Sequence, residues 1–166
     1  PITEFVEEIS SKQVPRVPGT AVFMSGTPAT VPNAMHAHYR HVKAVHEHLI
    51  FLSIIIEHYP KHKTRQRIRI IPLGQNVYQV IAFYGFIEVP NMHHIIEKIH
   101  EYGVPVHMSD VSFFLSRGLP VSSSSRYLDG WREYLFIFLS HNAAGATEYF
   151  KLPVQRVVEL GVRFRI

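Results

Sequence analysis

The apolar run from Leu49 to Ile56 limits the fold of this 166-residue chain more than any other segment. Every position except Ser53 is apolar, and the run closes on three consecutive isoleucines. Successive side chains of a strand point to opposite faces, so a strand that is apolar throughout is buried on both faces. A span across a bilayer would need about 20 apolar residues. The run therefore predicts a central strand that is covered above and below, as in a layered α/β domain.

The segments around this run predict how the sheet is connected. Residues 20–25 form a short apolar run, and a helical stretch with Asn33 as its N-cap separates them from the central strand. This order of strand, helix and strand favours a parallel pair joined by a right-handed crossover. Residues 68–71 and 77–86 are typical of two strands, and the Pro-Leu-Gly-Gln-Asn turn between them predicts an antiparallel hairpin.

The second half of the chain predicts two further helices and two further strands. Asn91 caps a helix over residues 92–102, in which isoleucines recur at helical spacing. The other expected elements are a strand at 111–115, a serine-rich loop at 118–127, a helix at 129–150 and a one-sided strand at 158–166.

Together these elements predict the fold class and the domain boundaries. We expect a single layered α/β domain over residues 19–166, built as a mixed sheet of about six strands flanked by about three helices, with an internal hairpin. Residues 1–18 are polar and interrupted by prolines, which is typical of a linker.

The composition excludes several classes of protein. The chain contains no cysteine, which excludes disulfides, thiolate zinc sites and cysteine nucleophiles. Lys and Arg outnumber Asp and Glu by 17 to 13, an excess that favours anionic partners but is too small and scattered to predict nucleic-acid binding. No glycine-rich phosphate motif or nucleophile motif occurs, so we predict no cofactor and no enzymatic activity.

The histidine-rich segment at residues 33–47 holds four of the twelve histidines on what we predict to be one helix. A metal or anion site on this helix competes with an ordinary solvated face. His38 and His41 are three residues apart and would share a face, but their spacing matches no known metal motif. We therefore favour the solvated face and predict no metal site. The alternatives are a stand-alone metal-dependent hydrolase that uses this helix, and a pH sensor that uses His36, His38 and His41.

A further signal comes from short strings that follow one another in a characteristic order. They are Arg16–Phe23, His41-x-Lys43-x-x-His46-Glu47, Tyr84-Gly85-Phe86 with Glu88 and Pro90, Ser112–Leu115, Trp131-Arg132 leading to Leu135-Phe136, Asn142–Ala144 and Arg156–Gly161. In this order they resemble the cytoplasmic C-terminal domain of the KUP (HAK/KUP/KT) potassium uptake transporters. The resemblance covers nearly the whole chain, and it depends on the ordered set rather than on any single string.

This resemblance implies a domain at the cytoplasmic face of the inner membrane. Residues 1–18 would connect it to a transmembrane part of the same transporter, which handles potassium and protons in symport. The domain itself would have a regulatory or assembly role without turnover, and a homodimer is one expected assembly. Because some transporters of this kind are inhibited by cyclic di-AMP, the resemblance also implies a cyclic dinucleotide as a ligand. The basic residues that would bind its phosphates are Arg16, His41, Lys43, His46, Arg117 and Arg156.

Overall fold

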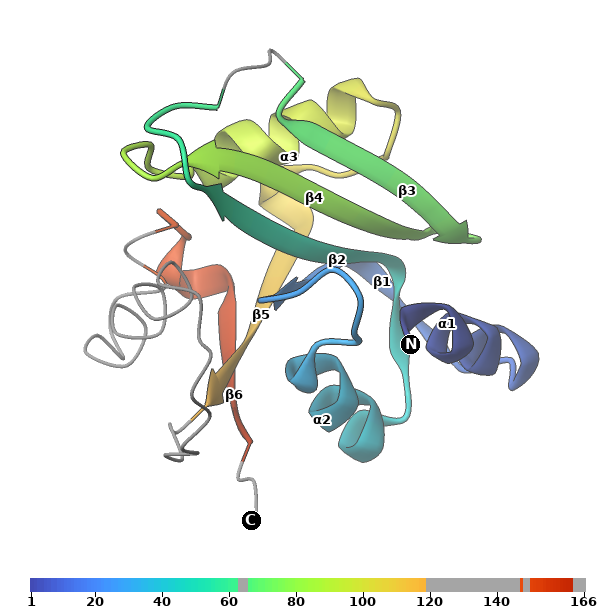
Figure 1. The fold of residues 1–166 in the computed structure, drawn as a ribbon. Helices are drawn as coiled ribbons and strands as arrows, with labels where there is room; N and C mark the ends of the chain where they lie inside the picture. Colours follow the sequence, from blue (N-terminus) through green and yellow to red (C-terminus); the bar gives the residue numbers. More distant parts are fainter. Residues whose placement is uncertain (63–65, 119–146, 148–149, 163–166) are drawn as a thin grey trace.

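The computed structural model describes residues 1–62, 66–118, 147 and 150–162. Figure 1 shows a twisted sheet with helices on both of its faces. The elements, in chain order, are α1 (Ile2–Ser11), β1 (Arg16–Ser25), α2 (Asn33–Val42), β2 (Val45–Glu57), β3 (Ile68–Gly74), β4 (Val77–Gly85), α3 (Met92–Glu101), the 3₁₀ helix η1 (Met108–Asp110), β5 (Val111–Gly118), the 3₁₀ helix η2 (Val154–Arg156) and β6 (Val157–Val162).

The six strands lie in the order β3-β4-β2-β1-β5-β6. Five of them are parallel, and β3 runs antiparallel to its neighbour β4. Helix α2 connects β1 to β2, and α3 lies between β4 and β5, so both are crossovers between parallel strands. The predicted mixed sheet with an internal antiparallel hairpin is confirmed. Pro72 fits within β3 because an edge strand tolerates a missing backbone donor.

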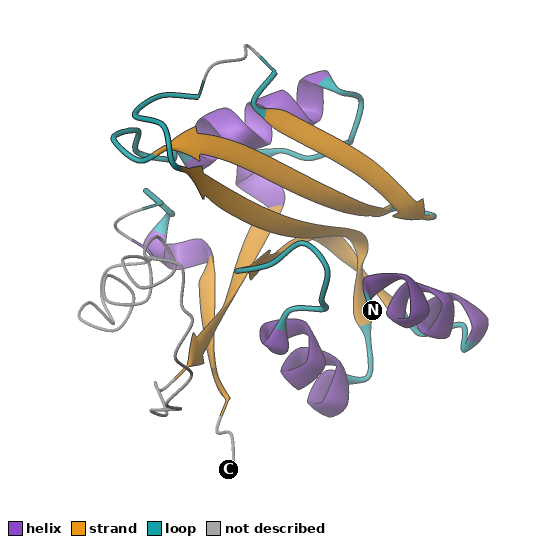
Figure 2. Ribbon diagram, in the orientation of Figure 1, coloured by secondary structure: helices purple, strands orange, loops and turns teal. Residues whose placement is uncertain are grey.

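The sheet separates two hydrophobic cores (Figure 2). Helix α3 covers one face, and α1 and α2 cover the other. Neighbouring residues of β2 belong to different cores, because Ile50 and Leu52 pack under α3 while Leu49 and Phe51 pack under α1 and α2. All four side chains are at most 1% exposed. The central strand that the apolar run predicts is therefore confirmed, and it is buried on both faces.

Helix α1 corrects the expectation of an irregular segment at the start of the chain. Its residues Ile2, Phe5, Val6 and Ile9 are buried against the sheet, and their spacing is that of an amphipathic helix. The prolines that suggested a linker follow the helix and do not interrupt it. The assignment of residues 1–18 as a connector to a membrane region stays a prediction.

The histidine-rich helix was predicted to reach Glu47, but α2 ends at Val42. Lys43 adopts a left-handed conformation with φ 55°, and its N–H donates to the carbonyl of Tyr39 at 3.0 Å. Strand β2 then begins at Val45, so His46 lies on a strand and not on the helix.

Helix α3 agrees with the prediction from the sequence. Its cap Asn91 accepts a hydrogen bond from the N–H of His93, as the N-cap pattern predicts.

Two predicted elements lie almost entirely outside the described residues, namely the loop at 118–127 and the helix at 129–150. The predicted last strand is confirmed as β6, and its final residues, 163–166, are also outside the described part. In the segments that the structure describes, no helix combines the length and hydrophobicity of a membrane span.

Candidate functional site

Two of the strings from the sequence meet at the amino edge of the sheet. Strand β1 begins at Arg16, and β2 begins one residue before His46. In the parallel register Arg16 lies opposite Val45, and Val17 lies opposite His46. A bulge follows, in which Gly19 adopts φ +100°, a conformation that favours glycine. The pairing of β1 with β2 therefore brings together residues that are far apart in the sequence.

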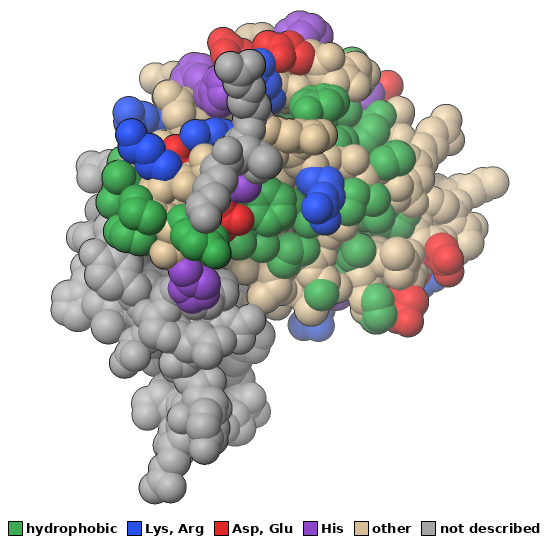
Figure 3. Space-filling model, turned by 45° about the horizontal axis from the view of Figure 1, so that its top comes forward, with side chains coloured by type: hydrophobic (Ala, Val, Ile, Leu, Met, Phe, Trp, Pro, Cys, Tyr) green, Lys and Arg blue, Asp and Glu red, His purple; other side chains and the backbone are tan. Residues whose placement is uncertain are grey.

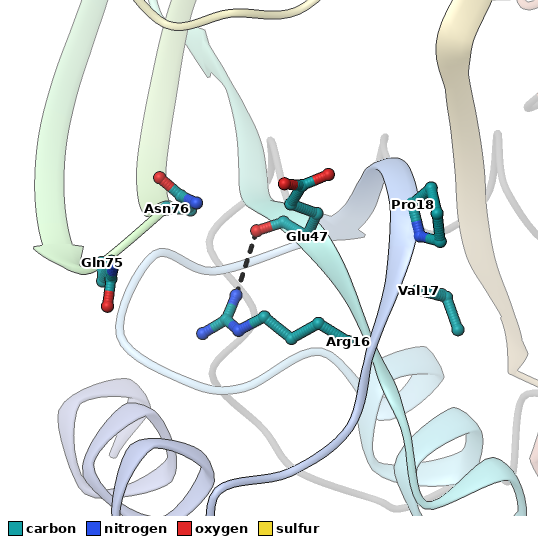
Figure 4. Close-up of a pocket in the computed structure, with 6 residues that line it drawn as sticks. All are labelled: Arg16, Val17, Pro18, Glu47, Gln75 and Asn76. Atoms are coloured by element: carbon teal, nitrogen blue, oxygen red, sulfur yellow. Dashed lines mark hydrogen bonds between the residues drawn. The ribbon is translucent and has the colours of Figure 1, made fainter.

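A hollow of about 440 Å³ lies at this edge, between the first residues of β1 and β2 and the turn that joins β3 to β4 (Figure 4). Nη1 of Arg16 donates to the backbone carbonyl of Glu47 at 3.0 Å, which fixes the guanidinium at the wall of the hollow. The residues that line the hollow are Arg16, Val17, Pro18, Glu47, Gln75 and Asn76.

The lining of this hollow combines donors and an acceptor. Both hydrogen bonds that Arg16 makes to described residues use Nη1, with the carbonyls of Glu47 and His46 as acceptors. A guanidinium carries five N–H donors in one plane, so further donors can meet a carboxylate or phosphate. Gln75 and Asn76 add amide groups, and the Glu47 carboxylate accepts hydrogen bonds. The hollow can bind a ligand that has an anionic group and hydrogen-bond donors of its own.

His38 of α2 and His46 of β2 lie side by side, with ring centroids 5.8 Å apart. Both meet the ring of Phe114 edge to face, at 5.1 and 5.6 Å. The ring of Phe23 stacks on that of Phe114, with the ring centroids 4.6 Å apart, so the two histidines pack against a pair of aromatic rings, which we call the aromatic floor. Within the described structure, Nε2 of His38 and Nδ1 of His46 are buried without a hydrogen-bond partner.

This environment lowers the pKa of both histidines. Burial lowers the pKa of His38 from 6.5, and the hydrogen bond to the carbonyl of Ala44 only partly opposes it. Burial also lowers the pKa of His46, His38 lowers it further, and the charge of Asp110 acts in the opposite direction. Both shifts favour the uncharged rings. The lowered pKa of His46 therefore disfavours the positive charge that its predicted role in phosphate binding requires.

The other candidate residues lie on separate elements. His41 is in the last turn of α2 and Lys43 directly follows it, and both are exposed. Arg156 ends η2 just before β6, which is two strands away from β1. Arg117 lies on β5 opposite Gly161, and its side chain is outside the described part. The structure thus brings Arg16 next to the backbone of His46, whereas Arg117 lies on β5 and Arg156 lies in η2.

The histidine-rich segment is divided between α2 and β2. His38 is half-buried on the aromatic floor, whereas His41 is exposed, so the two do not present a shared face. Among the described residues, no three His, Asp or Glu side chains are grouped in a way that could hold a metal ion. The described part of the chain therefore gives no support to the metal-dependent hydrolase.

A second cluster of interacting residues lies at the carboxyl edge of the sheet. It includes Gly85 and Glu88, which belong to the string Tyr84-Gly85-Phe86 with Glu88 and Pro90. Oε2 of Glu88 accepts hydrogen bonds from the backbone N–H groups of Gly85, at 2.7 Å, and of His62, at 2.9 Å. Its Oε1 lies 2.7 Å from Nη2 of Arg67. We call Glu88 and these three partners the Glu88 clamp. It ties the turn after β4 to two points of the connection between β2 and β3, His62 and Arg67.

The electrostatics of the Glu88 clamp strongly favour the carboxylate. Burial by itself would raise the pKa of Glu88, but the two backbone hydrogen bonds and the Arg67 guanidinium outweigh burial and lower the pKa from 4.5 to about 2. His62 is held from its other side, because Nδ1 lies 2.5 Å from Oε2 of Glu57 and the ring stacks on Phe83. In the sequence Glu88 stands out only as part of a string, and its contacts with His62 and Arg67 could not be predicted because no regular spacing connects these residues.

Known proteins are similar to this sequence over nearly its whole length. Residues 18–166 match the family model described as the K+ potassium transporter C-terminal domain. The chain is 38% identical, over 162 residues, to the probable potassium transport system protein Kup 2 of Syntrophobacter fumaroxidans, an alignment that covers 98% of the chain and 25% of the relative. It is 36% identical to the probable potassium transport system protein Kup 1 of Paramagnetospirillum magneticum, over 100% of the chain and 26% of the relative. It is 39% identical to the Kup 1 protein of Aeromonas hydrophila, over 95% of the chain and 25% of the relative. The chain thus spans about a quarter of the length of these relatives. No solved structure matches it.

Proposed function

Because the chain belongs to the K+ potassium transporter C-terminal domain family, we propose that it is the cytoplasmic regulatory domain of a proton-coupled potassium uptake transporter. The ions cross the inner membrane through a transmembrane part of the same transporter. The observation that carries the proposal is the match over residues 18–166, together with relatives that are four times longer and are named as probable potassium transport system proteins.

The packing of α1 supports a regulatory role. A regulatory domain acts by binding a ligand more tightly in one state of the transporter than in another. If residues 1–18 connect the domain to the membrane part, α1 is the first element to transmit such a change. The ring of Phe5 in α1 contacts the ring of Tyr39 in α2 at 5.6 Å, and Val6 packs directly against Gly74, next to the hollow. A rearrangement at the hollow would therefore reach the connector.

Cyclic di-AMP is the ligand that we propose for this hollow. A volume of about 440 Å³ is within the usual range for small-molecule sites, and Arg16 supplies a charged donor for a phosphate. A cyclic dinucleotide has two equivalent phosphates, so a two-fold homodimer would offer each of them one Arg16. His41, in the last turn of α2, and Lys43, directly after it, are exposed, and the ammonium group of Lys43 could add a charged donor. The lowered pKa of His46 disfavours a charged contribution from its ring.

Calorimetry with the 166-residue chain and cyclic di-AMP tests this ligand. Replacing Arg16 by glutamine is expected to weaken binding about ten- to a hundredfold, because hydrogen bonds to a charged group contribute about 1.5–3 kcal/mol. Lys98→Gln is the matched control, since Lys98 lies on α3, across the sheet from α1 and α2. Absence of both heat and a melting shift would exclude cyclic di-AMP. Equal losses in the two variants would contradict the placement at the hollow.

Rubidium uptake tests the regulatory role itself. The transporter that carries this domain, and the same transporter cut after residue 18, would be expressed in cells without potassium uptake systems of their own. We expect the shortened transporter to carry rubidium with an altered maximal rate or half-saturation concentration, because regulation and transport reside in different parts. Unchanged kinetics at equal membrane abundance would contradict the regulatory role.

A further inference from the structure

The Glu88 clamp fixes two loops against one another at the carboxyl edge of the sheet. The N–H of Phe86 donates to the carbonyl of Tyr59 at 2.9 Å, and the N–H of Ile87 donates to the carbonyl of Pro60 at 3.2 Å. These bonds add to those that Glu88 makes. The turn after β4 thus has its backbone held by the loop after β2, and its side chains are displayed in a fixed arrangement.

Four large apolar side chains of these loops are exposed to solvent. The exposed fraction is 51% for Tyr59, 58% for both Phe86 and Ile87, and 55% for Val89. We call these four residues the edge patch. Single exposed apolar residues are normal on a protein surface, but several on one ordered edge indicate an interaction site. Phe86 and Ile87 contribute only their backbone N–H groups to the bonds between the loops, so these bonds do not account for the two apolar side chains.

Lys61, an exposed cation, lies next to the edge patch. The carboxylates of Glu57 and Glu88 are turned away from solvent, because Glu57 contacts the ring of His62 and Glu88 pairs with Arg67, with side-chain exposures of only 28% and 14% for the two acids. Figure 3 shows hydrophobic side chains next to Lys and Arg side chains on the side of the molecule where β2 and β4 end. An apolar patch beside an exposed lysine complements the interface of an anionic bilayer.

We propose that the edge patch docks the domain onto a membrane that contains anionic lipids. Tyr59, Phe86, Ile87 and Val89 enter the boundary between headgroups and acyl chains, while Lys61 meets the lipid phosphates. A second copy of the chain fits this surface less well, because a stable protein interface takes about 20–30 residues a side, whereas a few apolar side chains beside cations suffice for reversible membrane binding. The proposal does not depend on the regulatory function, since the chain alone can be tested for docking.

Co-sedimentation of the 166-residue chain with lipid vesicles tests the proposal. We expect binding to vesicles of phosphatidylcholine mixed with phosphatidylglycerol, little binding to phosphatidylcholine alone, and weaker binding as salt increases. The double substitution Phe86→Ser and Ile87→Ser should reduce the affinity at least about tenfold, because two half-exposed apolar side chains are lost from the contact. Lys61→Glu should reduce binding to the anionic vesicles as well. The matched control replaces Val42 and Tyr102, which are exposed to 55% and 54% on other elements, by serine and should bind like the original chain.

Three results would overturn membrane docking by this surface. The first is equal binding, or no binding, to the two kinds of vesicle. The second is unchanged binding by both the Phe86 and Ile87 double variant and Lys61→Glu, with circular dichroism to verify that both are folded. The third is a lipid-free dimer that the double variant converts to a monomer, because a second copy would then be the partner of the edge patch.

Discussion

Replacing Gly85 by alanine is expected to lower the free energy of unfolding by about 3 kcal/mol, the upper part of the range for overpacking. Gly85 ends β4 directly beneath the chain that leaves β2. A methyl group on Gly85 would lie 2.5 Å from the backbone nitrogen of Lys61, and it would collide with the carbonyl oxygen of Pro60 as well. These are backbone atoms that cannot rotate away, so the loop must move. The hydrogen bond from the Gly85 N–H to Glu88 would be disturbed with it.

Urea unfolding at neutral pH measures this effect. Gly26→Ala is the matched control, because a methyl group at Gly26 meets no atom within 4 Å. The control should stay within about 0.5 kcal/mol of the original protein, as is usual for substitutions that create no contact. If the two variants were equally stable, the close approach of the two loops at Gly85 would be wrong.

Replacing Glu88 by glutamine is expected to remove up to about 3 kcal/mol of stability at pH 7. The folded protein holds Glu88 at a pKa of about 2, against 4.5 for the unperturbed group. The unfolded chain therefore binds a proton at a pH where the folded protein does not. Such a lowered pKa stabilises the fold fully above the unperturbed value, and this stabilisation is lost as the pH falls toward the folded value.

The pH dependence of the unfolding free energy shows whether the charge of the Glu88 carboxylate, and not only the size of its side chain, stabilises the fold. The difference in unfolding free energy between the original protein and Glu88→Gln should be largest above pH 5 and should shrink between pH 4.5 and about 2. Glu101→Gln serves as the control, because Glu101 pairs with Lys98 at the surface, where ion pairs contribute about 0–1 kcal/mol. A difference that stays constant from pH 7 to about pH 2 would contradict an ionised carboxylate at the centre of the clamp.

The sheet could be predicted because its signals are local. The apolar run of β2, interrupted only by Ser53, reflects burial on both faces, and the turn before Val77 reflects a hairpin. Asn91 and the isoleucines after it specify α3 by capping and spacing. Each of these features follows from neighbouring residues, so the sequence alone carries it.

Other features depend on contacts between distant segments. Helix α1 has the apolar spacing of an amphipathic helix, but the prolines after it suggested a linker, and only the packing of its apolar face on the sheet reveals the helix. The end of α2 has no glycine or proline signal, because Lys43 itself takes the left-handed conformation. The pKa values of His38 and His46 are lowered because folding buries the two rings side by side. Two of the three partners of Glu88, His62 and Arg67, come from a loop more than twenty residues earlier, which no local pattern reveals.

Transport by purified protein in proteoliposomes tests the central claim, a regulatory domain of a potassium transporter, most directly. The intact transporter and the form cut after residue 18 would be reconstituted at equal density, which removes differences in expression. The account predicts potassium uptake driven by a proton gradient in both, with a rate or potassium affinity that changes when the domain is absent. Identical rates and affinities in the two forms, with and without cyclic di-AMP, would contradict it.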